Sequence, residues 1–189
     1  MRLTFANKVT IGRIIIVPFF IVAMVYYRPN RDYFRTIALG IFLLAVLTDI
    51  IDGYIARTLQ EKTKAGAILD PLADKLLLIS AFICLYRVGP LLGSIRFPFW
   101  LVIAVISRDT ILLVGSLIIY VMHGALDISP TAWGKTTTFF QIICVFGVLL
   151  QSPLSIVLWI ITAVLTVISG VDYIRSGIKV LNAPVENHS

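Results

Sequence analysis

The sequence predicts an all-α integral membrane protein with six transmembrane helices, and three observations lead to this fold class. Hydrophobic residues make up 59% of the 189 positions and the mean hydropathy is +0.97, whereas a soluble domain is about 45–50% apolar. Only 14% of the residues are charged, compared with about 25% in an average soluble domain. The apolar runs are long and continuous rather than alternating, which favours helices over a transmembrane barrel.

Six segments have the length and apolar character, or nearly so, of a helix that crosses a bilayer, which takes about 20 residues. They cover approximately residues 9–27, 36–57, 67–88, 98–121, 134–151 and 154–175. The stretches between them are rich in Pro, Gly and polar residues, which form turns. No repeat or change in composition marks a second domain, so we expect residues 1–189 to form a single membrane domain. The first segment is longer than the apolar region of a signal peptide and has no convincing cleavage site, so we expect it to be retained.

The basic residues predict that both termini face the cytoplasm, because cytoplasmic loops carry an excess of Lys and Arg. The predicted cytoplasmic set is Arg2, Lys8, Arg13, Arg57, Lys62, Lys64, Lys75, Lys135, Arg175 and Lys179, and the outer set is Arg28, Arg31, Arg35, Arg87 and Arg96. The net charge of +6 fits such loops. It does not indicate binding to nucleic acid, because no basic face remains once the lipid-facing surface is assigned.

Cysteine and histidine chemistry is not indicated. Cys84 and Cys144 both lie in apolar runs, which is typical of buried free thiols that pack as small apolar side chains. His123 and His188 have no partner at the spacing of metal ligands.

Two pairs of aspartates lie at the predicted cytoplasmic ends of the second and third spans. Asp49 and Asp52 are three residues apart and Asp70 and Asp74 are four apart, so each pair shares one helix face. The connection, roughly residues 58–66, is short. The two helices must therefore run antiparallel, and their carboxylates can face each other.

Three explanations of the aspartates are open. Solvated charges at helix ends are the simplest, but a carboxylate at mid-membrane depth costs roughly 2.5–3.5 kcal/mol, and close like charges tend to protonate. A proton or sodium relay is the second. The third, which we favour, is a site for one or two divalent cations, since Mg2+, Mn2+ and Ca2+ prefer hard oxygen ligands.

The residues between the aspartate pairs suggest a phosphate-bearing ligand. Gly53, Ala56 and Gly66 leave room for a ligand to approach the backbone. Small residues also allow close helix packing in membranes. Arg57 can bind a phosphate group with its planar guanidinium. Together with metal ions these residues suit a diphosphate substrate.

This pattern resembles the signature of the CDP-alcohol phosphatidyltransferase family. The eight matching positions are Asp49, Asp52, Gly53, Ala56, Arg57, Gly66, Asp70 and Asp74, all at the spacings of the signature. Eight fixed positions form a far more specific signal than a short motif. The chain length and six predicted spans agree with the CDP-alcohol phosphatidyltransferase fold, so the resemblance extends over nearly the whole chain.

The resemblance implies a reaction and a set of site residues. In this family the phosphatidyl group of CDP-diacylglycerol passes to an alcohol and CMP leaves, with two divalent ions, Mg2+ or Mn2+, at the site. The implied metal ligands are Asp49, Asp52, Asp70 and Asp74, and Asp74 is also the implied base for the acceptor hydroxyl. The implied CDP-lipid site comprises Asp49, Gly53, Ala56, Arg57 and Gly66. Paired metals stabilise the attacking and leaving oxygens of an in-line displacement.

Shorter motifs resemble the bacterial phosphatidylglycerophosphate synthases, whose acceptor is glycerol 3-phosphate. The matching residues are Asn7, Thr10, Arg13, Pro18, Gly134, Lys135, Thr138, Gln141, Ser169, Gly170, Tyr173 and Gly177. Three positions depart from that pattern: Asp109 stands where those enzymes often have Glu, Ser116 where they often have a further Arg, and Thr137 where a second Lys would be. We expect glycerol 3-phosphate as acceptor. Part of the pattern also resembles cardiolipin synthases, which use phosphatidylglycerol, and an inositol phosphate or another polar alcohol is a further alternative.

Arg108 and Lys135 are the predicted acceptor-binding residues. Arg108 lies inside the fourth predicted span, where an unpaired cation is costly. A local ion pair would explain it without a ligand, but the adjacent Asp109 points to a different helix face, so such a pair is not automatic and anion binding is our preferred role. For Lys135, a side chain that extends to the membrane surface is the alternative explanation.

Two further classes of protein make different predictions. A cation-coupled transporter would show a pseudo-symmetric second half, and the second half has no counterpart of the aspartate pairs. A non-catalytic helix-packing protein has no reason to keep buried acids at these spacings. We therefore predict an enzyme in a bacterial cytoplasmic membrane, with its active site on the cytoplasmic side, membrane lipids around it and, by the family resemblance, a homodimeric state.

Overall fold

The computed structural model describes residues 5–59, 64–92, 97–123 and 132–181, and this part of the chain is helical apart from short connections. Its elements are α1 (Phe5–Tyr26), α2 (Tyr33–Leu59), α3 (Lys64–Val88), the short 3-10 helix η1 (Gly89–Leu91), α4 (Phe99–His123), α5 (Ala132–Leu149) and α6 (Ser155–Leu181). Each of the six segments predicted from the sequence is an α-helix, and the ends differ from the prediction by a few residues. The all-helical prediction is therefore confirmed for the described residues.

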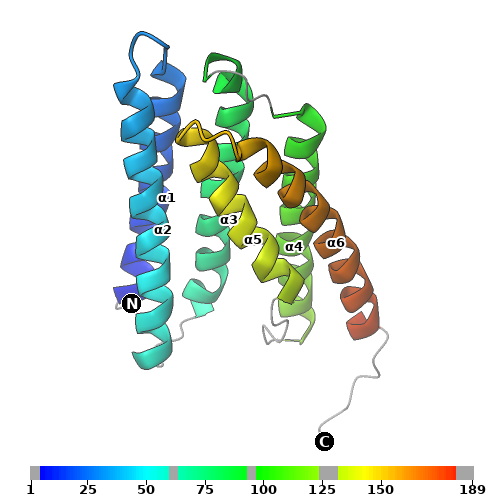
Figure 1. Cartoon of the computed structure of the whole chain (residues 1–189). Coiled ribbons are helices and arrows are strands. Elements are labelled where there is room, and N and C mark those ends of the chain that lie inside the picture. Colours follow the sequence, from blue (N-terminus) through cyan, green and yellow to red (C-terminus); the bar gives the residue numbers. More distant parts are fainter. Residues whose placement is uncertain (1–4, 60–63, 93–96, 124–131, 182–189) are drawn as a thin grey trace, which may run out of the picture.

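The helices alternate in direction and form an up-and-down bundle (Figure 1). Helix α1 packs against α2 and α3, α4 packs against α3 and α6, and α5 packs against α6, α3 and α2. The last turns of α2, α4 and α6 and the first turns of α1, α3 and α5 consequently lie at one end of the bundle, the lower end in Figure 1. We call this end the aspartate end, because the helical residues Asp49, Asp52, Asp70 and Asp74 lie toward it.

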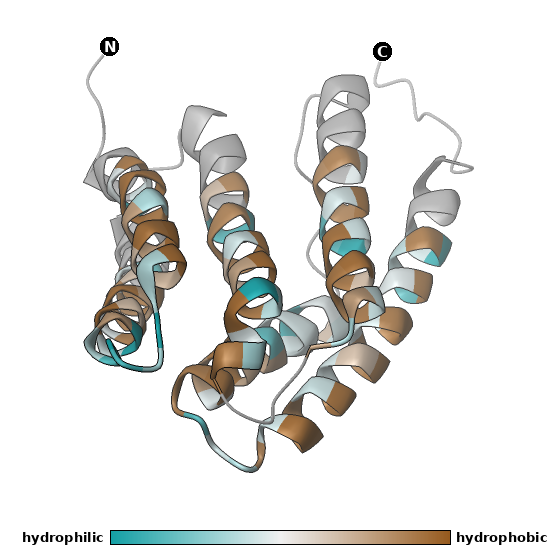
Figure 2. Cartoon of the chain, turned by 90° about the horizontal axis from the view of Figure 1, so that it is seen from above, coloured by the Kyte–Doolittle hydropathy of each residue, from teal (hydrophilic) through white to brown (hydrophobic). Residues whose placement is uncertain are grey.

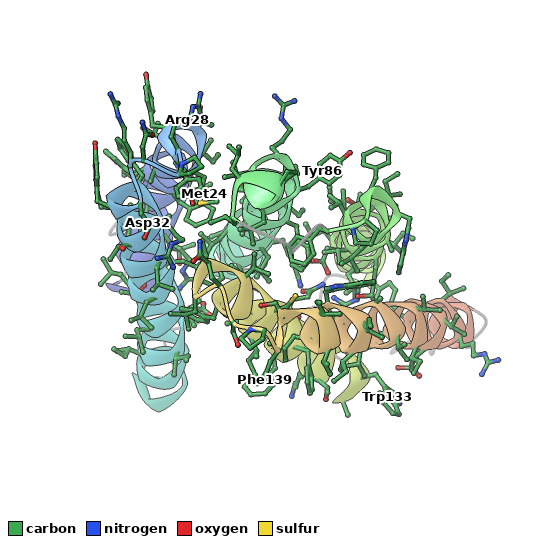
Figure 3. All side chains as sticks on the ribbon, turned by 45° about the horizontal axis from the view of Figure 1, so that its top comes forward. Met24, Arg28, Asp32, Tyr86, Trp133 and Phe139 are labelled. Atoms are coloured by element: carbon green, nitrogen blue, oxygen red, sulfur yellow. The ribbon has the colours of Figure 1, made fainter. Side chains whose placement is uncertain are left out.

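The composition of the helices is that of a membrane protein. Within the described residues, three helical segments are long and apolar enough to cross a membrane: Tyr33–Ile51, Ala132–Leu149 and Ser155–Ser176. A shorter apolar helical segment covers Thr10–Tyr26. In Figure 2, which colours the residues by hydropathy, hydrophobic residues recur along the described helices. Trp133 and Phe139 project outward from α5 (Figure 3) and are 48% and 58% exposed. An exposed apolar surface of this extent is expected where lipid replaces water.

The end of the bundle opposite the aspartate end has an aromatic core. The ring centroids of Phe42 on α2 and Phe20 on α1 are 5.9 Å apart, and those of Phe42 and Phe146 on α5 are 5.0 Å apart. Phe82 on α3 stacks on Phe97 at 5.5 Å. All these rings except Phe146 are fully buried or nearly so. The rings around Phe42 join α1, α2 and α5, and the Phe82–Phe97 contact joins α3 to the segment before α4.

A tight connection joins α5 to α6 at this same end. The N–H of Ser152 donates to the carbonyl of Gly147 at 2.9 Å, and Gln151 has a φ of 54°, so the turn closes with a left-handed residue. A Cβ on Gly147 would come within 2.8 Å of Leu158 Cδ1, so a larger residue there would require the Leu158 side chain to move. Cys84 and Cys144 are buried and free, as predicted.

Candidate active site

Asp49 on α2 is paired with an arginine from α1. Arg13 Nη1 lies 2.5 Å from Asp49 Oδ1. Arg13 is only 3% exposed, whereas the Asp49 side chain is 47% exposed. The ion pair between α1 and α2 therefore holds the carboxylate from one side and leaves its other side open.

Asp74 on α3 lies within range of the same charges. It is half-buried, and the charges acting on its carboxyl group are those of Lys75, Asp49, Arg13 and Asp109. Helix α1 packs against both α2 and α3. Helix α1 thus brings the carboxylates of Asp49 on α2 and Asp74 on α3 within range of the same charges.

The other residues of the predicted metal and donor sites lie outside the described side chains. The backbone of Asp52, Gly53, Ala56 and Arg57 belongs to the last turns of α2, and that of Gly66 and Asp70 to the first turns of α3. No three His, Cys, Asp or Glu side chains gather into a metal site within the described residues. The described pair, Asp49 and Asp74, does supply hard oxygen donors from two helices that both pack against α1, which fits a divalent cation. The four-aspartate ligand set stays a prediction.

Arg108 on α4 is held by three other groups. Its Nη1 donates to Asp109 Oδ1 at 2.6 Å, its Nη2 and Nε donate to Ser169 Oγ on α6 at 2.6 and 3.1 Å, and its Nη2 also contacts the Gly134 carbonyl on α5 at 3.3 Å. The local ion pair that we considered not automatic is therefore present. The long guanidinium side chain reaches round the helix to its neighbour, although the two Cα–Cβ bonds point to different faces.

Lys75, the residue after Asp74, is joined to the same cluster. Its Nζ lies 3.2 Å from Asp109 Oδ1 and 3.2 Å from Thr138 Oγ1 on α5, and the residue is 8% exposed. We call Lys75, Arg108, Asp109, Thr138 and Ser169 the buried charge network. It connects α3, α4, α5 and α6, and it begins at the residue next to the proposed catalytic aspartate.

Lys135 lies beside this network on the outside of α5. It directly follows Gly134, whose carbonyl Arg108 contacts, and its side chain is exposed. The two residues predicted to bind the acceptor therefore belong to one part of the structure. The exposed side chain is compatible with a surface role as well as with ligand binding.

Two buried groups in this region have polar atoms without a hydrogen-bond partner among the described residues. They are Asp109, through Oδ2, and Gln141 on α5, through both atoms of its amide. Both residues are 0% exposed, and Gln141 lies one helical turn from Thr137 and Thr138. Unsatisfied buried polar groups are uncommon in folded proteins.

The sequence argument missed the ion pairs of Arg13 and Lys75. Lys75 was assigned only to the count of cytoplasmic charges, and Arg13 to that count and to the motif near the start of the chain. The signal that could have found them is their position inside otherwise apolar helices, since a cation there requires a partner. The identity of each partner could not be read from spacing, because Arg13 is 36 positions from Asp49 and Lys75 is 34 positions from Asp109.

The chain has extensive similarity to known proteins. Residues 3–168 match the model of the family described as CDP-alcohol phosphatidyltransferase. A probable phosphatidylglycerophosphate synthase of Mycobacterium tuberculosis is 34% identical over 180 residues, which cover 92% of this chain and 81% of that protein. The CDP-diacylglycerol–glycerol-3-phosphate 3-phosphatidyltransferase of Haemophilus influenzae is 30% identical over 183 residues, covering 93% and 94% of the two chains. A cardiolipin synthase (CMP-forming) of Oryza sativa subsp. japonica is 39% identical over 111 residues, covering 57% of this chain and 33% of that protein.

Proposed function

The chain belongs to the CDP-alcohol phosphatidyltransferase family, and from this premise we propose that it transfers a phosphatidyl group from CDP-diacylglycerol to glycerol 3-phosphate. The observation that carries the choice of acceptor is the similarity to relatives named for this reaction. Those from H. influenzae, Aquifex aeolicus and Bacillus subtilis are 30–33% identical and aligned over most of both chains. In the reaction a bond forms between the acceptor oxygen and the phosphorus of the phosphatidyl group, the bond to CMP breaks, and the acceptor hydroxyl loses its proton.

The family is generally dependent on divalent metal ions, and the oxygen donors of Asp49 and Asp74 fit such ions. We assign the ligands to Asp49, Asp52, Asp70 and Asp74 and the ions to two Mg2+ or Mn2+. When bound, the ions supply positive charge to the attacking and leaving oxygens. Arg13 holds Asp49 in place, and Asp74 accepts the proton of the acceptor hydroxyl.

The remaining assignments are those that the family resemblance implies, and the position of the aspartate end is compatible with them. Gly53, Ala56 and Gly66 leave space for the nucleotide of the donor, and Arg57 binds its diphosphate. Arg108 and Lys135 bind the acceptor. The substrates meet where the helices end, because the donor is a lipid and the acceptor dissolves in water. We place this end at the cytoplasmic face of a bacterial membrane, with six spans and a homodimeric assembly.

A cardiolipin-type reaction, with phosphatidylglycerol as acceptor, is the second candidate. One observation favours it: Ser116 occupies the position where the glycerol 3-phosphate enzymes often have a further Arg. The phosphomonoester of glycerol 3-phosphate carries up to two negative charges and is best held by several cations, whereas the phosphodiester of phosphatidylglycerol carries one charge and places less demand on them.

The experiment that tests the function is an acceptor screen. Purified protein is given CDP-diacylglycerol and Mg2+ or Mn2+, and CMP release is measured with glycerol 3-phosphate, phosphatidylglycerol, inositol 1-phosphate, inositol or serine. We expect release with glycerol 3-phosphate, dependent on metal and lost on addition of a chelator. Release with phosphatidylglycerol alone would replace the acceptor, and no metal-dependent release from folded protein with any acceptor would overturn the proposal.

A further inference from the structure

The proposed acceptor site has a shortage of positive charge that the buried charge network can explain. Arg108 and Lys135 are the predicted acceptor-binding residues, and Ser116 stands where a further Arg is often found. Arg108 is moreover paired with Asp109 at 2.6 Å, so much of its charge is already balanced. Another cation is needed if a phosphate group is to bind here.

We propose that Lys75 is this further cation, and thus a specificity-determining residue that contacts the phosphate group of the acceptor. The proposal rests on the phosphatidyl-transfer function given above. Lys75 and Arg108 both contact Asp109 Oδ1, at 3.2 and 2.6 Å, so Lys75 Nζ and Arg108 Nη1 are about 6 Å apart at most. Two cations at this spacing can each donate to an oxygen of one phosphate group, with charge-assisted bonds of about 2.8 Å.

The charges of the network favour an anion beside it. Lys75 and Arg108 share one carboxylate, that of Asp109, while the proposed function assigns the neighbouring Asp74 to a metal ion. A net positive charge in a buried place is costly, and a bound phosphate lowers that cost. Asp109 opposes phosphate binding by its own charge, but it also fixes both cations in place.

The geometry of α3 explains why this residue suits the role. Consecutive residues of a helix point about 100° apart, so Asp74 and Lys75 serve different faces of α3. The Asp74 carboxyl group lies within range of Asp49 and Arg13, whereas Lys75 Nζ is held between α4 and α5 by Asp109 and Thr138. An acceptor whose phosphate contacts Lys75 would have its hydroxyl end close to the base. An ammonium group has three donors, and the two protein contacts leave one for the ligand.

The test compares three variants of the full-length protein in the CMP-release assay. Lys75→Met removes the charge and keeps the length of the side chain, Lys75→Arg restores the charge, and Arg87→Met is the matched control, because Arg87 is exposed in the last turn of the same helix. We expect Lys75→Met to raise the KM for glycerol 3-phosphate about tenfold or more. Its KM for CDP-diacylglycerol and its metal requirement should stay within about twofold of wild type. Lys75→Arg should recover most of the loss, and Arg87→Met should match wild type.

Other results would overturn the assignment. An unchanged KM for glycerol 3-phosphate, or an equal rise of both KM values, would give Lys75 a structural role only. If Lys75→Met does not fold, Thr138→Val provides the second variant, since it removes one neutral contact of Lys75 Nζ. A KM for glycerol 3-phosphate that stays at the wild-type value in Thr138→Val would count against the proposal.

Should wild-type protein fail to use glycerol 3-phosphate, the proposed function fails separately. Thermal stabilisation by inorganic phosphate then tests Lys75 by itself: we expect it in wild type and Arg87→Met and not in Lys75→Met, and equal stabilisation of all three would refute the site.

Discussion

The two ends of the helix bundle are stabilised by different means. At the end opposite the aspartates, α1, α2 and α5 meet through aromatic rings, with Phe42 at the centre of the contacts. At the aspartate end, helices meet through ion pairs: Arg13 with Asp49 across α1 and α2, and Lys75 with Asp109 across α3 and α4. The same bundle thus has an apolar half and a charged half.

This difference indicates that the charged groups at the aspartate end serve the proposed reaction rather than the stability of the fold. Replacing a buried ion pair by well-packed apolar residues is often neutral or stabilising, so ion pairs are a poor means of holding helices together. The aromatic core shows that helices of this chain, α1 and α2 among them, also pack through buried apolar rings. Charged groups at the other end are therefore best explained by the metal ions and the phosphate-bearing substrates that the proposed reaction requires.

The largest effect is expected from Asp74→Asn. Asn has nearly the same shape as Asp, but it neither accepts the proton of the hydroxyl nor contributes a full negative charge. Loss of a general base alone lowers a rate by about 10²–10⁴, so we expect at least a hundredfold loss of CMP release with an unchanged melting temperature. Asp172→Asn on α6 is the matched control and should retain activity. Substantial activity in Asp74→Asn would exclude Asp74 as the base.

Phe42→Ala should lower the stability of the protein and leave its catalytic properties unchanged, the opposite of Asp74→Asn. Phe42 is fully buried between two other rings, and removal of a buried Phe side chain costs about 3–5 kcal/mol. We expect a clear loss of stability in unfolding experiments in micelles, with the KM values of the surviving folded protein near wild type. Leu44→Ala, at a side chain that is 54% exposed, should change stability by less than about 0.5 kcal/mol. A Phe42→Ala protein that is stable but inactive would break the distinction between the two halves.

The contrast between the halves also explains what the sequence could and could not predict. All six helices and their approximate ends follow from continuous apolar runs, and the free buried cysteines follow from their apolar surroundings. The Arg108–Asp109 pair was not expected, because helix geometry describes where a Cβ points and not where a long guanidinium ends. The partners of Arg13 and Lys75 lie on other helices, so only the packing of α1 on α2 and of α3 on α4 reveals them.

Gln141→Met is expected to change the stability of the protein by less than Phe42→Ala does. Both amide atoms of Gln141 are buried without a hydrogen-bond partner among the described residues, and a buried polar group left unsatisfied costs about 1–3 kcal/mol. Met has a similar length and adapts to irregular space, so we expect the free energy of unfolding to be unchanged or higher by about 1 kcal/mol. A large loss of stability, or a raised KM for glycerol 3-phosphate with stability unchanged, would mean instead that the amide binds a water molecule or the acceptor.

The smallest effect concerns Asp32, which lies before α2 at the end of the bundle opposite the aspartates, near Arg28 in Figure 3. Arg35 donates to both carboxylate oxygens of Asp32, through Nε at 2.8 Å and Nη2 at 2.5 Å, and these hydrogen bonds hold the pKa of Asp32 below its ordinary value. A carboxyl group with a lowered pKa in the folded state contributes stability above its unfolded pKa of about 3.9, and that contribution is lost as the pH falls through the folded pKa.

Because the Asp32 side chain is 48% exposed, its contribution should amount to only a few tenths of a kcal/mol. We expect Asp32→Asn to lower the melting temperature slightly at pH 7, and the difference from wild type to disappear once the pH is below the folded pKa. Arg35 also donates to the Leu149 carbonyl at 2.6 Å, and Asp32 orients it for that contact between α2 and α5. A difference in melting temperature that persists unchanged at acidic pH would show that the Asp32 side chain acts through its shape. Its charge would then contribute nothing to stability.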